Sequence, residues 1–426
     1  MIGKEIHNFA LKLWPLNRSI TGEGLRETLK EISQHLPDLK IKSFKSDLKV
    51  FDWTVPEEWH VNEAYIIDPE GKKICDFSKN NLHLVGYSSP FRGKMQLNDL
   101  QKYLHSLPDQ PNAIPYITSY YERKWGFCLT QKQRDDLIEG QYEVMIDSKI
   151  FKGQLNYGEL ILPGKSDKEV FLSTYICHPS MANNELSGPT VLTFLAKWLS
   201  GLKNRNYTFR LIFIPETIGS ISYLSKNLEY LKKKVIAGFN ISCVGDERSY
   251  SYLPSRNGNT ISDKVAKHVL KWTDPDYKIY SWLDRGSDER QYCAPGVDLP
   301  IASILRTKYG EYPEYHTSLD NLDEVVTPKG LDGGYWILRR AIEALEKNIF
   351  YINKVLCEPQ LVKRGFYKSH SAKKIEKNVS TTKHLLSYCD GKHSLLDIAE
   401  KIEIPIWKLY ELVDELVLQD LISQEK

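Results

Sequence analysis

Short apolar strands alternate with amphipathic helices along the second half of the chain, and this alternation constrains the fold more than any other feature. Strands of the buried type are predicted over residues 170–175, 209–214, 237–244 and 299–305. Apolar residues at helical spacing predict helices over 188–202, 220–233, 261–272 and 331–347. Strands connected through helices form a largely parallel sheet with helices on its faces. The expected fold class is therefore α/β.

Chemically active side chains follow the predicted strands. His178 comes after the first strand, Glu216 after the second and Asp246 after the third, while the fourth leads into Tyr315 and His316. In open α/β sheets, ligands bind outside the carboxyl ends of the strands. A single His or Glu in such a loop ordinarily only caps a helix or binds a loop carbonyl. Their occurrence at four successive strand ends favours a functional site.

Composition and length limit the class of protein. With 426 residues the chain exceeds one compact core, which predicts two or three domains. The chain contains 57 Lys and Arg residues and 55 Asp and Glu residues, so its net charge is too small to attract nucleic acid or an anionic membrane. Seven scattered cysteines without a CxxC pair do not indicate a disulfide framework. The N-terminus does not read as a signal peptide, and no stretch of ~18 apolar residues occurs, so a cytoplasmic protein that crosses no membrane is expected.

Imidazoles and carboxylates at one sheet edge are the ligands of a catalytic zinc ion, which three protein groups bind while a fourth position stays open for water. The metal lowers the pKa of that water, and a free carboxylate beside it can take the proton. Glu216 has the location expected of this base.

Four segments, in this order, resemble the motifs of the co-catalytic zinc aminopeptidases, a group that includes bacterial leucyl aminopeptidase, glutamate carboxypeptidase and glutaminyl cyclase. The segments are His178 with 184–188, then 216–220, 286–300 and 315–320. The whole chain resembles more closely an uncharacterised bacterial family in which an aminopeptidase-like domain hosts an inserted β domain and ends in a winged helix. For that family, the genomic setting implies a link to cell-surface polysaccharide assembly.

The resemblance implies roles at some positions and losses at others. His178 and His316 match the first and last histidine ligands, and Glu216 matches the base. The metal-bridging Asp of the aminopeptidases falls on Asn184, and their second glutamate falls on Thr217. The acid that they carry two residues after the first histidine is Ser180 here. Two complete zinc sites cannot be built from matching positions.

One zinc site can be built. Its ligands are His178, Glu185 and His316, with Glu216 as general base. Glu185 is preferred to Asn184 because an anionic oxygen binds Zn²⁺ better than an amide does. Further metal ligands, or groups that orient a ligand, are Asp246, Asn184 and Asp288; the last of these equally suits a surface pair with Arg285 or Arg290.

Other residues have two interpretations each. Arg18 and Tyr315 are candidate substrate-binding groups, able to stabilise an oxyanion. Arg18 also belongs to a polar stretch, 18–24, that suits a turn between two helices. Cys177 beside His178 is better explained as a small core residue than as a nucleophile. Most aromatic residues of the β-rich segment are expected in the core, although a stacking surface for sugar or peptide is the alternative.

The pattern divides the chain into four parts. An aminopeptidase-like domain is expected over 1–45 and 164–357, an inserted mostly-β domain over 46–163, a basic linker over 358–379 and a winged helix over 380–426. The third helix of the last part has one lysine and three acids within 407–416, which argues against DNA reading. A protein-contacting or dimer-forming role fits it better.

The predicted function is zinc-dependent hydrolysis of an amide or peptide bond, in a peptide or an amide-bearing small molecule, with one zinc ion rather than two. The alternative is a non-catalytic, metal-binding scaffold or regulatory protein that acts through its β and winged-helix modules. Loss of carboxylates at Ser180 and Thr217 favours the scaffold, whereas retention of Glu216 favours the enzyme.

Overall fold

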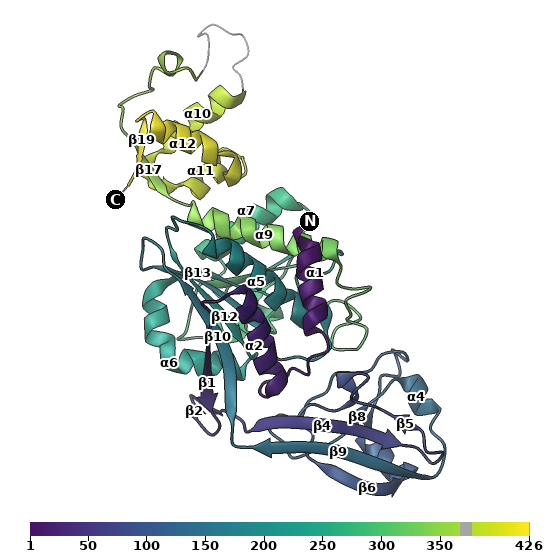
Figure 1. Ribbon diagram of the computed structural model, residues 1–426. Coiled ribbons are helices and arrows are strands. Elements are labelled where there is room, and N and C mark those ends of the chain that lie inside the picture. Colours follow the sequence, from purple (N-terminus) through teal and green to yellow (C-terminus); the bar gives the residue numbers. More distant parts are fainter. Residues whose placement is uncertain (367–376, 426) are drawn as a thin grey trace.

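An eight-stranded mixed sheet forms the centre of the molecule. The computed structural model describes residues 1–366 and 377–425 (Figure 1). The strand order is β1-β10-β12-β11-β13-β16-β14-β15. The strands are β1 (Lys40–Lys45), β10 (Gln154–Leu162), β11 (Glu169–Tyr175), β12 (Thr208–Ile214), β13 (Val235–Asn240), β14 (Ser251–Leu253), β15 (Lys278–Ile279) and β16 (Ile301–Leu305). The central strands β12, β11, β13 and β16 run parallel, which confirms the predicted α/β class.

Helices cover both faces of this sheet, which explains why the central strands β11 and β12 are buried along almost their whole length. On one face α1 (Ile2–Leu13), α2 (Glu23–His35), α5 (Ser187–Ser200), α7 (Ile261–Thr273) and α9 (Pro328–Glu346) share a core with Val170 and Leu172. On the other face α6 (Ile218–Lys234) and α8 (Glu289–Tyr292) pack near Phe171. Alternate residues of β11 thus enter opposite cores, and all of its residues are buried.

The segment between β1 and β10 forms an inserted β-rich unit at one end of the molecule (Figure 1). Its four-stranded antiparallel sheet has the order β5-β4-β9-β6. Its elements are β2 (Lys49–Val50), β3 (Trp53–Thr54), β4 (Glu58–Ile67), β5 (Lys73–Ile74), β6 (Phe91–Gln96), α3 (Leu97–Leu100), β7 (Leu104–His105), β8 (Phe127–Cys128), α4 (Gln131–Asp135) and β9 (Gln141–Phe151). β10 pairs with β1 and β12 in the main sheet, although its sequence pattern had placed it in the 46–163 unit.

A winged helix lies at the opposite end of the molecule (Figure 1). It contains β17 (Phe350–Asn353), α10 (Lys377–Tyr388), β18 (Asp390–Ser394), α11 (Leu395–Lys401), α12 (Tyr410–Leu418) and β19 (Ile422–Gln424). Because β17 pairs with β18 and β19, this unit starts before residue 358, the predicted start of the linker. Residues 367–376 of the predicted 358–379 linker lie outside the described residues. None of the helices in the described ranges is long and apolar enough to cross a membrane.

Candidate functional site

The carboxyl ends of β11 and β12 open into a cavity of about 370 Å³. Tyr175 pairs with Ile214 at the ends of these strands, so the residues that follow emerge side by side. The cavity is lined by Ile20, Trp53, Tyr116, Thr118, Tyr120, Tyr121, Cys177, His178, Glu216, Thr217, Ile218 and His316. Its volume is within the range of small-molecule sites. Glu216, His178 and His316, three of the predicted site residues, therefore share one pocket.

The two histidines face each other across this pocket. Their ring centroids lie 5.7 Å apart, and His178 Nε2 lies 3.7 Å from Glu216 Oε2. Burial lowers the pKa of His178 well below its usual value, with the charges of His316 and Arg18 acting in the same direction. Burial also lowers the pKa of His316 to about 4. Both imidazoles are therefore neutral near pH 7 and have a lone pair available for a metal or a proton.

Glu216 is held in the pocket by an unusual turn. The next residue, Thr217, has a left-handed φ of 62°, and its N–H donates to Asp288 Oδ1 at 2.8 Å. Ser220 Oγ donates to the same oxygen at 2.8 Å, so Asp288 anchors the start of α6. Burial, and then the charge of Asp288, raise the pKa of Glu216 to about 8. Asp288 thus fixes the turn that presents Glu216.

Positive φ angles recur in the loops that follow the central strands, and two of these residues, Thr217 and His316, line the pocket. Non-glycine residues with positive φ include Ser180, Thr217, Cys243 and His316, with φ of 44°, 62°, 50° and 56°. Such conformations cost free energy and persist where the surrounding structure enforces them, which is common at functional sites. Three of these residues lie next to or within segments that the sequence singled out.

Glu185 is turned away from an open coordination position. It lies in a π-helical turn, Ala182–Leu186, and is fully buried. Its carboxylate accepts from Arg18 Nε at 3.0 Å and from the His178 N–H at 3.2 Å. Burial raises the pKa of Glu185 to about 7, while Arg18 acts in the opposite direction. Ligation of a metal by Glu185 stays a prediction, and it requires this carboxylate to leave Arg18.

Two of the additional candidates take part in loop contacts. Asp246 accepts from Asn183 Nδ2 at 3.0 Å and from the Thr307 N–H at 2.8 Å. Asn184 accepts the Tyr175 hydroxyl at its carbonyl, at 2.5 Å, and at Oδ1, at 3.2 Å. Asn184 Nδ2 is buried and has no hydrogen-bond partner within the described ranges.

The two candidate substrate-binding residues lie behind the cavity wall. Arg18 is fully buried, and besides Glu185 it donates to the backbone carbonyls of Leu13, at 2.5 Å, and His178, at 3.1 Å. Tyr315 stacks on His316 with ring centroids 3.9 Å apart. Both support residues of the pocket, and neither is among the described residues that line it.

The inserted unit contributes a contact that the sequence did not predict. The Tyr116 N–H donates to the His316 carbonyl at 2.9 Å, and Pro115 forms a β-bridge with Thr317. The Tyr116 ring centroid lies 5.2 Å from the ring centroids of both His178 and His316. The sequence interpretation favoured the core for most aromatics of this unit, because composition does not show which ring faces a distant loop. Tyr116 instead closes the pocket between the two histidines.

The donor atoms suit zinc only in part. Within residues 1–366 and 377–425, no group of three or more His, Cys, Asp or Glu side chains is arranged to hold a metal ion. Two neutral imidazoles with Glu216 beside one of them nevertheless match the chemistry of a zinc site. His178 and His316 therefore fit a zinc ion, whereas Glu185 fits only after exchanging its partner.

Comparisons with known proteins agree with this architecture. Residues 7–348 match a family described as a domain of unknown function (DUF4910), and residues 349–424 match a winged helix-turn-helix family. A Clostridium acetobutylicum protein, named as a candidate polysaccharide biosynthesis protein with an aminopeptidase-like domain, is 42% identical over 423 residues, which cover 99% of this chain and 96% of that protein.

Two examples from the solved structures show the range of similarity to this one. The crystal structure of a candidate peptidase from Clostridium acetobutylicum has a TM-score of 0.93 and 41% identity, and the match covers 100% of this chain and 97% of that one. A zinc aminopeptidase from Bacillus subtilis has a TM-score of 0.59 at 13% identity, with 80% of this chain and 95% of that one covered. The second likeness is one of fold alone.

Proposed function

Because the chain belongs to the DUF4910 family and ends in a winged helix, on an aminopeptidase-like fold, we propose that it is a zinc-dependent hydrolase that cleaves an amide bond. The observation that carries this proposal is the position of Glu216. Its carboxylate lies 3.7 Å from His178 Nε2, in a pocket that also contains His316. An acid with a raised pKa beside two neutral imidazoles is a typical catalytic arrangement.

Different residues of the chain have different roles in the proposed reaction. A zinc ion, when bound at His178 and His316, supplies Lewis acidity and lowers the pKa of a water molecule. Glu216 takes the proton of the attacking water and returns it to the leaving amine. Asp288 keeps Glu216 in place through the Thr217 N–H, and the Tyr116 ring packs against both imidazoles.

The substrate we propose is an amide-bearing small molecule, either an N-acyl or aminoacyl group on a sugar precursor or a short peptide. The name of the Clostridium relative, which refers to polysaccharide biosynthesis, supports the sugar-linked alternative. All seven cysteines are free, which supports action in the reducing cytoplasm. The acidic face of α12, with Glu411, Asp414 and Glu415, supports a protein partner or a second copy of the chain rather than DNA.

A second candidate function is a non-catalytic metal-binding scaffold. The Arg18–Glu185 pair favours it, because that carboxylate is already neutralised by a protein cation. The positions Ser180, Asn184 and Thr217, which lack the aminopeptidase carboxylates, favour it as well.

The metal content of the purified protein shows whether the protein binds zinc. Protein purified without a metal-binding tag is analysed by mass spectrometry for zinc, with about one equivalent expected. His178→Ala and His316→Ala should each lose the metal, whereas the His60→Ala change, at a half-buried histidine of the inserted unit, should leave it bound. Parent protein with almost no zinc overturns the proposal.

Turnover then separates the enzyme from the scaffold. Aminoacyl amides and aminoacylated amino sugars are screened with zinc-loaded protein. Glu216→Gln should reduce kcat by about 10²-fold or more while zinc content stays the same. Equal turnover by parent and variant rules out Glu216 as the base, and a metal-loaded parent without turnover on any of these substrates supports the scaffold.

A further inference from the structure

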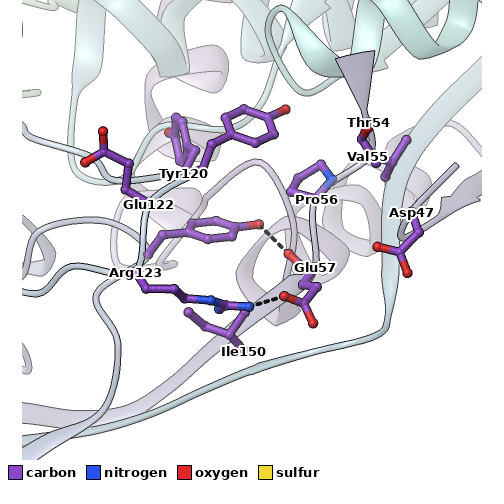
Figure 2. Close-up of a pocket in the computed structure, with 11 residues that line it drawn as sticks. Asp47, Thr54, Val55, Pro56, Glu57, Tyr120, Glu122, Arg123 and Ile150 are labelled. Atoms are coloured by element: carbon purple, nitrogen blue, oxygen red, sulfur yellow. Dashed lines mark hydrogen bonds and ion pairs between the residues drawn. The ribbon is translucent and has the colours of Figure 1, made fainter. Parts of the chain in front are cut away.

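A second cavity adjoins the pocket of Glu216. It has a volume of about 200 Å³ and lies within the inserted unit, between residues 54–57 at the end of β3 and residues 120–123 (Figure 2). Tyr120 and Tyr121 line both cavities, so the two spaces meet at these side chains. A substrate that extends beyond the Glu216 pocket along this direction therefore enters the second cavity.

Aromatic rings are exposed where the two cavities meet. The side chains of Trp53 and Tyr121 are 39% and 54% exposed, and their ring centroids lie 5.8 Å apart in an edge-to-face arrangement. The Tyr120 hydroxyl is hydrogen-bonded to the Tyr116 hydroxyl at 2.8 Å, which fixes its ring relative to the pocket. Clustered large rings that remain exposed at the mouth of a cavity indicate a ligand that packs on their faces.

The charges around the second cavity are already paired. Three carboxylates occur among the described residues that line it, on Asp47, Glu57 and Glu122. Glu57 pairs with Arg123, as Figure 2 shows, while Asp47 pairs with Lys152 and Glu122 with Lys124. The six charges sum to zero.

Because these charges are paired, the cavity favours a ligand without charge. A free ammonium group would be matched by an unpaired carboxylate, and a phosphate by an unpaired cation. Paired charges instead offer both donors and acceptors to groups without charge, such as hydroxyls. Apolar ring faces combined with a neutral, hydrogen-bonding rim match a sugar, which has C–H faces and hydroxyl edges.

We propose that Trp53, Tyr120 and Tyr121, together with the Glu57–Arg123 pair, bind an uncharged saccharide portion of the substrate. The position of the substrate amide at Glu216 rests on the proposed function, whereas saccharide binding at these rings does not. The inserted unit thereby supplies the specificity of a pocket whose reactive groups come from the main sheet.

Binding is measured by isothermal titration calorimetry with the full-length Glu216→Gln protein, so that turnover does not affect the readout. The probes are N-acetylglucosamine, N-acetylgalactosamine and di-N-acetylchitobiose, with tri-alanine as the peptide comparison. At least one saccharide should bind saturably, and tri-alanine should bind more weakly. Failure of hydrolysis with saccharide binding intact overturns the proposed function alone.

Substitutions test whether the saccharide binds to these rings. Trp53→Ala and Tyr121→Ala should each weaken saccharide binding by about tenfold, whereas Tyr121→Phe, which keeps the ring, should retain it. Trp336→Ala is the matched control, because this tryptophan on α9 is 43% exposed, close to the 39% of Trp53. Absence of saccharide binding, unchanged binding in the two alanine variants, or tighter binding of tri-alanine that depends on Trp53 overturns the saccharide assignment.

Discussion

Arg18 and Glu185 form a fully buried ion pair directly behind the pocket, at a distance of 3.0 Å. Removing one partner of such a pair leaves the other charge buried without compensation, which typically destabilises a protein by about 3–5 kcal/mol. We expect Arg18→Met to lower the free energy of unfolding by about this amount at pH 8, as measured by urea denaturation.

The double variant Arg18→Met/Glu185→Gln is the control for this prediction. It removes both charges and should recover part of the loss. The losses in the free energy of unfolding caused by Arg18→Met alone and by Glu185→Gln alone are added for comparison. A double variant that loses more than this sum would contradict a stabilising role of the charge pair.

Asp288 acts on Glu216 through the backbone of Thr217, and its charge also raises the pKa of Glu216. Asp288→Ala removes the acceptor of the Thr217 N–H and of Ser220 Oγ, so the turn loses its fixed geometry. With an active substrate, kcat should fall by about tenfold to 10²-fold while KM and zinc content change little. Asp288→Asn keeps an acceptor oxygen and should recover most of the rate; an equal loss in both variants would show that the charge, and not the hydrogen bonds, is required.

At the scale of elements, His268 connects α7 to the winged helix. Its Nδ1 is paired with Glu400 of α11, and its Nε2 accepts the Ile406 N–H at 2.9 Å. Lys271 lies 3.6 Å from the same glutamate, and Trp407 packs edge-on against the imidazole. Protonation of Nε2 would remove the acceptor for Ile406.

The stability of this junction should depend on pH. Burial lowers the pKa of His268 from its ordinary value of 6.5, so the unfolded chain takes up a proton at pH values where the folded chain does not. The contribution of His268 is therefore complete above about pH 6.5 and declines below it. Between pH 7.5 and 5.5, the wild-type Tm should fall about 1 °C more than that of His268→Gln. Parallel declines in both proteins would exclude His268 as the cause.

At the scale of the whole molecule, the three units share two continuous cores. One core joins the helices beside Leu172 to Leu385, Ile398 and Val413 of the winged helix. The other joins Phe171 and the opposite face of the sheet to Trp59 and Ile146 of the inserted unit.

This continuity predicts cooperative unfolding of the full chain. Tryptophan fluorescence reports on residues in all three units, and far-ultraviolet circular dichroism reports on the backbone throughout, so the two thermal transitions should coincide. Two resolved transitions would show that at least one unit unfolds independently.

Local patterns in the sequence were sufficient for the main elements. The apolar runs within β11 and β12 and the helical spacing of α5 and α7 reflect burial on both faces of a sheet, which is a property of short segments. The rule that ligands bind at the carboxyl ends of parallel strands then predicted His178, Glu216 and His316 at one rim, and these three side chains share a pocket. The likeness to zinc aminopeptidases also proved to be a likeness of fold.

The sequence by itself therefore determined the strands, the helices and the rim that carries the reactive side chains, because periodicity and chain order are local information. The tertiary structure alone decided that Glu185 faces Arg18, which is 167 residues earlier, that β10 joins the main sheet, and that Tyr116 and Trp53 line the pocket. These contacts depend on how distant segments return to one another, and hydrophobic spacing contains no information about which partner a buried charge or an exposed ring will meet.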